Sequence, residues 1–172
     1  HSFPTRRSSD LAMTLTKVMA KFHGWRYYSP FLESLTFLGP YKKYDVTGKN
    51  APKSWLTKDT DIVKAYYSNP KCTFKFSLNA YMGLFEAVYF DNQKKNIDKI
   101  PKELPVFIVS GEDDPVGNLG EGVKKVYQKF LQAGMKDVSC KLYKNDRHEI
   151  LNETDREQVY ADLLGWMQKR IK

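Results

Sequence analysis

The chain has 172 residues, of which 41% are hydrophobic and 28% are charged, and its formal net charge is +8. This composition is that of one globular domain and excludes a disordered or fibrous protein. No apolar run approaches the roughly 20 residues that span a bilayer, and no signal-peptide pattern opens the chain, so we expect a soluble, cytoplasmic protein.

The first eleven residues, HSFPTRRSSDL, are the in-frame translation of a widely used short-read sequencing adapter. A protein sequence rarely coincides with such an adapter over its whole length, so we interpret residues 1–11 as a non-native tail and exclude them from the fold. On this interpretation, we expect the natural chain to continue upstream of Ala12.

Residues 12–98 have helical patterns and contain most of the aromatic side chains of the chain. Apolar residues recur at helical spacing from Leu11 to Phe22, and Gly24 follows where a C-terminal cap belongs. Further helical patterns cover residues 60–67 and 78–90, and Gly39-Pro40, Gly48-Lys49-Asn50 and Asn69-Pro70 are turn signals. We predict a helical subdomain whose aromatic side chains form either its own core or an apolar pocket.

Residues 99–172 have the pattern of an α/β unit. Val106–Val109 form an unbroken apolar run, which is typical of a strand buried on both faces of a parallel sheet. Helical spacing follows until Gly134, and an alternating strand pattern covers residues 138–142, which together have the length of a βαβ crossover. A last helix is predicted over 154–171, with a buried face formed by Val159, Leu163, Leu164, Met167 and Ile171.

Polar side chains follow both predicted strands, in the segments Gly111–Pro115 (GEDDP) and Lys144–Glu149 (KNDRHE). Functional groups of parallel sheets collect beyond the carboxyl ends of the strands, so a carboxylate and an imidazole should meet there. Asp114 and His148 are the candidate catalytic residues, as the acid and the general base. Asp113 competes for the role of the acid, and Asp114 could instead be a turn former before Pro115.

His148 also has an alternative interpretation, and two further residues lie near this edge of the sheet. His148 taken alone could be a surface or helix-capping histidine. Asn118 and Glu149 are candidates for bracing the site.

The segment SGEDDPVG, followed 34 residues after Asp114 by His148 within NDRHEILNE, resembles the closing half of an α/β-hydrolase triad. The resemblance is to lysophospholipases and monoglyceride lipases of the S33 serine aminopeptidase type and covers residues 12–172. YYSPFLESLTFLGPYKKY and WLTKDTDIV resemble the lid of that group more loosely. The implied fold class is α/β, as the C-terminal fragment of an α/β-hydrolase: a helical lid or cap over 12–98, then the last two parallel strands with their helices over 99–172.

The resemblance also implies a function. Asp114 would orient His148, and the enzyme would cleave a carboxylic ester, of a lysophospholipid or a monoacylglycerol, without a cofactor. The expected partner is a small-molecule or lipid ester substrate, with transient contact to a membrane surface.

The sequence departs from the family pattern because it contains no Gly-x-Ser-x-Gly elbow for the nucleophile. The order serine, acid, histidine in this fold places that serine upstream of residue 12, so the chain by itself is expected to be inactive. Alternatives on the same fold are an aminopeptidase, a thioesterase, or a dehalogenase or epoxide hydrolase with an aspartate nucleophile. A non-enzymatic basic binding module is the alternative of another class.

Charge and cysteines limit the remaining possibilities. Lysines occur in dispersed pairs between acidic residues rather than in one basic block, so no nucleic-acid partner is expected. Cys72 and Cys140 have neither a CxxC spacing nor a histidine at metal-ligand distance along the chain. We therefore expect two reduced, buried thiols, with no disulfide and no metal site.

Overall fold

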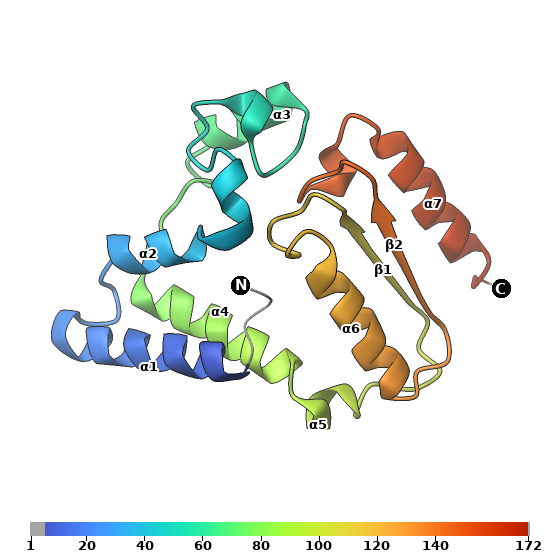
Figure 1. Ribbon diagram of the computed structural model, residues 1–172, viewed down its shortest axis with the longest axis horizontal. Coiled ribbons are helices and arrows are strands. Elements are labelled where there is room, and N and C mark those ends of the chain that lie inside the picture. The colour runs from blue at the N-terminus through green and yellow to red at the C-terminus, as the bar shows by residue number, and fades with distance from the viewer. Residues whose placement is uncertain (1–5, 172) are drawn as a thin grey trace.

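A computed structural model describes residues 6–171. Its first half is the helical subdomain, which begins with α1 (Arg6–His23) lying along α4 (Leu78–Asp91) (Figure 1). The shorter helices between and after them are α2 (Pro30–Thr36), the 3-10 turns Gly39–Lys43 and Ala51–Lys53, α3 (Thr60–Ser68) and α5 (Lys94–Ile97). The three helices that the sequence predicts in this half are thus confirmed.

Helix α1 ends as predicted but begins earlier. Gly24, with φ of +81°, donates its N–H to the carbonyl of Ala20, which is the left-handed cap that glycine favours. The helix begins at Arg6 rather than at Leu11, because no proline or glycine interrupts residues 6–10. Residues 1–5 of the predicted tail lie outside the described residues.

The subdomain has its own small apolar core, and only part of the aromatic set contributes to it. Ala20, Leu32, Leu78 and Tyr81 are buried, and Phe76 and Phe85 pack against them. The aromatic side chains that remain exposed are Phe22, Trp25, Tyr27, Phe31, Phe74 and Phe90. The prediction of an aromatic core therefore holds for a few rings.

The second half is a parallel pair of strands, β1 (Val106–Gly111) and β2 (Val138–Tyr143), in register from Val106↔Val138 to Gly111↔Tyr143. Helix α6 (Glu121–Gln132) connects them on one side, and α7 (Arg156–Gln168) lies on the other (Figure 1). A 3-10 turn, Ile150–Asn152, precedes α7. The strand–helix–strand unit that the sequence predicts is confirmed.

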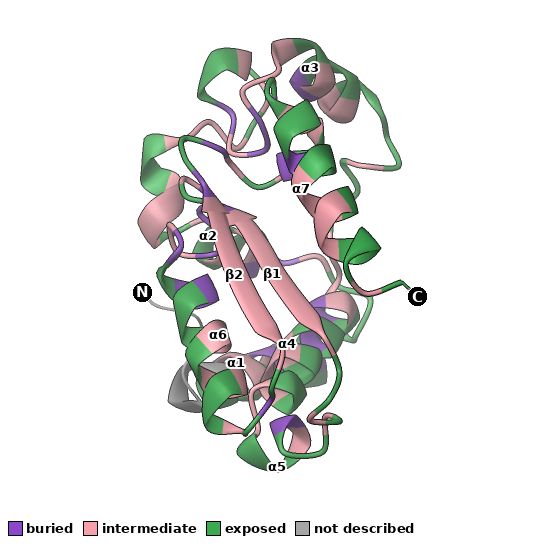
Figure 2. Cartoon of the chain, turned by 90° about the vertical axis from the view of Figure 1, so that its right-hand side faces the viewer, coloured by how far each residue is buried: buried purple, intermediate pink, exposed green. Residues whose placement is uncertain are grey.

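Three predictions about burial are wrong. Strand β1 is half-buried along most of its length, as β2 is, and not buried on both faces as predicted (Figure 2). Cys72 and Cys140 are free but only half-buried. On α7, Val159 is buried and Trp166 stacks on Phe107, but the remaining predicted inward residues, Leu164, Met167 and Ile171, are exposed.

The exposure of the strands and of one side of α7 has the same physical reason, the small width of the sheet. Two strands present a narrow surface that covers a single stripe of a helix, here at residues 159, 163 and 166. The neighbouring stripe lies about 100° around the helix and faces away from the sheet. Among residues 6–171, no helix is long and apolar enough to cross a membrane.

Candidate active site

The loops that carry the two predicted catalytic residues begin side by side, because Gly111 and Tyr143 are register partners at the ends of the strands. Backbone hydrogen bonds continue past the sheet: Glu112 donates its N–H to the carbonyl of Tyr143 and Asp113 to that of Asp146, each at 2.8 Å. We name residues 111–115 the acid loop and residues 144–149 the histidine loop. These main-chain contacts fix the two loops to each other.

Asp114 and His148 meet between these loops. Oδ2 of Asp114 lies 3.2 Å from Nδ1 of His148, and Oδ1 accepts the N–H of Val116 at 2.8 Å. The carboxylate side chain is 8% exposed and the imidazole 38% exposed. A buried carboxylate at Nδ1 holds a neutral imidazole in the tautomer that leaves Nε2 free to accept a proton.

The turn after Asp114 has an unusual backbone. Asn118 and Leu119 have φ of 52° and 55°, and Gly120 continues the left-handed run at 82°. The N–H of Leu119 donates to the carbonyl of Asp114 at 2.8 Å, so the turn closes on the acid. A non-glycine residue held in this region costs on the order of 1–3 kcal/mol, and such strain is concentrated at functional sites.

The competing acid faces another way. The carboxylate of Asp113 lies 3.5 Å from the ammonium of Lys43, and its carbonyl accepts the hydroxyl of Tyr44 at 2.7 Å. Asp114, rather than Asp113, is thus placed to pair with His148.

Asn118 and Glu149, the two residues predicted to brace the site, contribute through their backbones in the contacts that the structure describes. Asn118 forms the left-handed turn near Asp114. The N–H of Glu149 donates to the carbonyl of Leu56 at 2.8 Å, and its carboxylate accepts only the side-chain amide of Asn152. Neither side chain contacts Asp114 or His148 among the described hydrogen bonds.

Aromatic side chains of the helical subdomain extend to the site. The Trp55 ring lies 5.1 Å from the His148 ring at a tilt of 32°, and Tyr41 contacts Trp55 edge-on at 5.7 Å. Burial, with a smaller effect of the Asp114 charge, raises the pKa of Tyr41 to about 12. The sequence placed these rings in a lid, but no local pattern indicates that they contact a histidine so distant along the chain.

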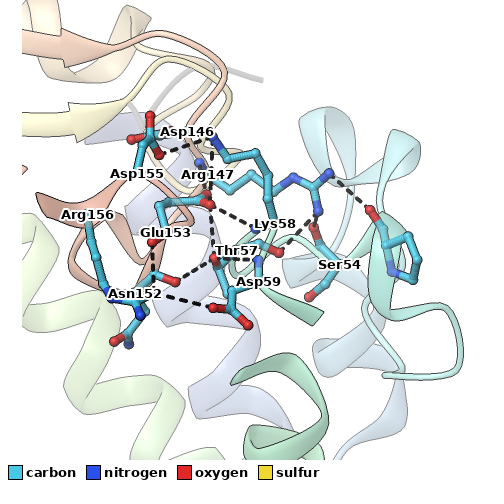
Figure 3. A network of polar contacts seen from close by, with 11 residues as sticks. Ser54, Thr57, Lys58, Asp59, Asp146, Arg147, Asn152, Glu153, Asp155 and Arg156 are labelled. Carbon is cyan, nitrogen blue, oxygen red and sulfur yellow. Dashed lines mark hydrogen bonds and ion pairs between the residues drawn. The ribbon is translucent and has the colours of Figure 1, made fainter. Parts of the chain in front are cut away.

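A group of three acidic residues lies beside the histidine loop. Carboxylate oxygens of Asp146, Glu153 and Asp155 lie within 4.8 Å of one another. The ammonium of Lys58 lies among them, 2.6 Å from Asp146, 3.4 Å from Asp155 and 3.9 Å from Glu153 (Figure 3). Desolvation raises the pKa of the buried Asp146, and the Lys58 charge opposes that effect.

No described serine supplies the missing nucleophile. Ser54 is buried and its hydroxyl accepts the N–H of Leu56, and Ser110 contacts Asp114 at the long distance of 3.5 Å. Within residues 10–171, no serine hydroxyl forms a hydrogen bond with His148. Residues 10–171 therefore pair a carboxylate with an imidazole and bring no serine hydroxyl to that imidazole.

Solved structures with a similar fold are esterases and lipases. A thermostable carboxyl esterase from Bacillus coagulans is 24% identical, with a TM-score of 0.78 over 97% of this chain and 53% of its own. A monoglyceride lipase variant from Saccharomyces cerevisiae is 20% identical, with a TM-score of 0.58 over 94% and 50%. A monoacylglycerol lipase from Paleococcus ferrophilus is 18% identical, with a TM-score of 0.55 over 90% and 63%.

These coverages show that the chain spans roughly half the length of the first two proteins. At such identities the likeness shows the fold alone, an α/β-hydrolase fold of the esterase and lipase type. The family model described as "Serine aminopeptidase, S33" matches residues 5–155, which is most of the sequence. The chain therefore belongs to the S33 serine aminopeptidase family of α/β-hydrolases.

Proposed function

We propose that the parent protein is a serine hydrolase that cleaves carboxylic esters, and that this chain supplies the acid and the general base of its catalytic triad. The observation that carries the proposal is the contact of 3.2 Å between Oδ2 of Asp114 and Nδ1 of His148 at the ends of two parallel strands. This is the orientation that a triad requires, in a chain of a serine hydrolase family.

In the proposed mechanism, a serine upstream of residue 12 attacks the ester carbonyl. Nε2 of His148 accepts the hydroxyl proton and then gives it to the leaving alcohol, which frees the acyl-enzyme for hydrolysis by water. Asp114 holds the ring and stabilises the imidazolium that forms at each step. The 172 residues alone contain no Gly-x-Ser-x-Gly elbow, so we expect them to be inactive.

The proposed substrate is a mono-acylated lipid, either a monoacylglycerol or a lysophospholipid. Support comes from Trp55 and Tyr41, which present aromatic surface beside His148. The yeast and archaeal proteins of similar fold are described as a monoglyceride lipase and a monoacylglycerol lipase. An aromatic wall next to the base suits an acyl chain and gives no preference for a head group.

We further propose that the helical subdomain contacts the lipid surface transiently. Phe31 and Leu35 are exposed one turn apart on α2, and Leu38 is exposed just after the helix. Lys42 and Lys43 follow within the next 3-10 turn. Exposed apolar groups beside cations are the combination that attracts a helix to an anionic interface.

The proposed function is tested on protein expressed from the gene with the sequence upstream of Ala12 restored. We expect a Gly-x-Ser-x-Gly elbow in that sequence and turnover of a p-nitrophenyl ester. His148→Ala should abolish turnover, whereas His23→Ala, on the solvent-exposed end of α1, should leave it unchanged. Turnover retained by His148→Ala would refute the proposal.

A second candidate is hydrolysis of an aminoacyl bond, which the description of the matching family favours. The same triad would serve, because attack on an amide also needs a base and an orienting acid. Comparing kcat/KM for a p-nitrophenyl ester with that for an aminoacyl p-nitroanilide separates the two. A preference for the anilide would replace the esterase proposal by the peptidase one.

A further inference from the structure

The loop that carries His148 is attached to the helical subdomain as well as to the sheet. The N–H of Glu149 donates to the carbonyl of Leu56 at 2.8 Å, and that of His148 points to the carbonyl of Trp55 at 3.5 Å. Residues 52–59, which we name the strap segment, therefore run beside the histidine loop. The strap segment belongs to the half of the chain that the sequence assigns to a lid.

Arg147, directly before His148, strengthens this attachment. Its guanidinium donates to three carbonyls of the strap segment, those of Pro52 at 3.1 Å, Ser54 at 2.5 Å and Thr57 at 3.3 Å (Figure 3). Such a fork of donors fixes the course of a loop that has no regular secondary structure.

Glu153 joins the two segments from the other side. Its side chain is fully buried, and Oε1 accepts the N–H of Arg147 at 2.7 Å. Oε2 accepts the N–H of Lys58 at 2.9 Å, and the hydroxyl of Thr57 lies between Oε2 at 3.0 Å and the carbonyl of Asn152 at 2.9 Å (Figure 3). One carboxylate thus receives a main-chain donor from the histidine loop and two donors from the strap segment.

The acidic group around Glu153 already contains a cation, the ammonium of Lys58. Lys58 places its ammonium 2.6 Å from Oδ1 of Asp146, and this aspartate is also fully buried. Glu153 has three donors on its two oxygens, which leaves little room for a metal bond. Lys58 is the cation of the cluster, and it comes from the strap segment.

We propose that Glu153 is a positioning residue for His148. Its hydrogen bonds to both segments fix the position of the histidine loop relative to the strap segment. Nδ1 of His148 therefore stays within hydrogen-bond distance of Asp114. On this view the strap segment is a fixed part of the active site rather than a moving part of a lid. The inference rests on the proposed function in one respect, because it takes His148 as the base.

The chemistry of the contacts explains why a carboxylate is needed. A carboxylate only accepts hydrogen bonds, and all three partners of Glu153 are donors. A glutamine has the same shape, but its NH2 group would face either Arg147 N–H or the Lys58 and Thr57 donors. At least one buried donor would then lose its acceptor, and the two segments would separate at that point.

The test is nitrogen NMR of the histidine rings and hydrogen exchange of the backbone amides, measured on the 172-residue chain. In the unchanged chain, we expect one tautomer of His148, with the proton on Nδ1. Glu153→Gln should mix the tautomers and speed exchange at the Arg147 and Lys58 amides by about tenfold or more, as expected for loss of a buried hydrogen bond. His23, stacked on Tyr27 on the helical subdomain, is the internal reference.

Glu149→Gln is the matched control. It removes the same charge at the residue next to His148, but the Glu149 carboxylate accepts only the Asn152 amide among the described contacts. We expect this variant to keep the single tautomer and the slow exchange. An equal effect of the two variants, or no effect of Glu153→Gln, would overturn the proposal.

If Glu153→Gln does not fold, Thr57→Val is the milder variant, because without a change of shape it removes only the hydroxyl that contacts Oε2, the Asn152 carbonyl and the Asp59 N–H. We expect it to speed exchange at Lys58 and to broaden the His148 signals, and unchanged signals would count against the proposal. These measurements do not require turnover. The inference can therefore fail while His148→Ala still abolishes hydrolysis, and it can hold if the proposed function fails.

Discussion

Gly111 lies directly against the carbonyl group of Asp146, so closely that a Cβ atom at position 111 would overlap it. This contact joins the end of β1 to the histidine loop. A side chain there would force apart the two loops that hold Asp114 and His148.

Gly111→Ala is therefore expected to destabilise the protein by about 3 kcal/mol, since the carbonyls of Asp146 and Arg147 are backbone atoms that cannot rotate away. Urea unfolding measures the change. Gly83→Ala is the control, because this position within α4 is open and the substitution should stabilise the helix by about 0.5–1 kcal/mol. Equal stabilities of the two variants would contradict the close contact at Gly111.

Asp114→Asn should lower kcat of the upstream-extended protein by about 10⁴-fold, because an amide NH2 at Nδ1 selects the wrong tautomer of His148. Asp113→Asn should change kcat by only a few fold, since that side chain faces Lys43. Steady-state kinetics with a p-nitrophenyl ester make the comparison. A larger loss for Asp113→Asn would move the acid to that residue.

Tyr41 should ionise only near pH 12. Its folded pKa lies above the ordinary value of 10, so its contribution to stability is present below pH 10 and is lost as the pH rises through 12. The phenolate absorbance of the unchanged chain minus that of Tyr41→Phe isolates this titration. Asp114→Asn should lower the Tyr41 pKa only slightly, because burial is the larger cause of its rise, so the pKa should stay above 10. An ordinary pKa of Tyr41 in the unchanged chain would refute the packing described for it.

The exposed face of α2 should bind anionic vesicles. Phe31→Ser combined with Leu35→Ser should weaken partition into phosphatidylserine-containing vesicles by about tenfold or more, as expected when two apolar side chains no longer enter the interface. Helix α7 lies across the molecule from α2 (Figure 1), and its exposed Leu164 is the control: Leu164→Ser should have little effect in a co-sedimentation assay. Equal losses for both would show that α2 has no special role.

Much of the site could be predicted from local patterns. The apolar run at Val106, the alternation around Cys140 and the helical spacing between them are backbone periodicities, and they were sufficient to predict two parallel strands. Since parallel strands end at the same edge, Asp114 and His148 could be expected to meet. The missing elbow is likewise a property of the sequence alone.

Other features depended on the tertiary structure. Local patterns left Asp113 as a competitor of Asp114, and only the tertiary structure pairs Asp114 with His148 and Asp113 with Lys43. The buried face of α7 was predicted too wide because the width of the sheet is not encoded in the periodicity of the helix. The contact of Trp55 with His148 and the bonds of Glu153 to the strap segment join residues far apart along the chain. Periodicity describes which side of an element is apolar, whereas such partners are chosen by packing between elements, which no local pattern records.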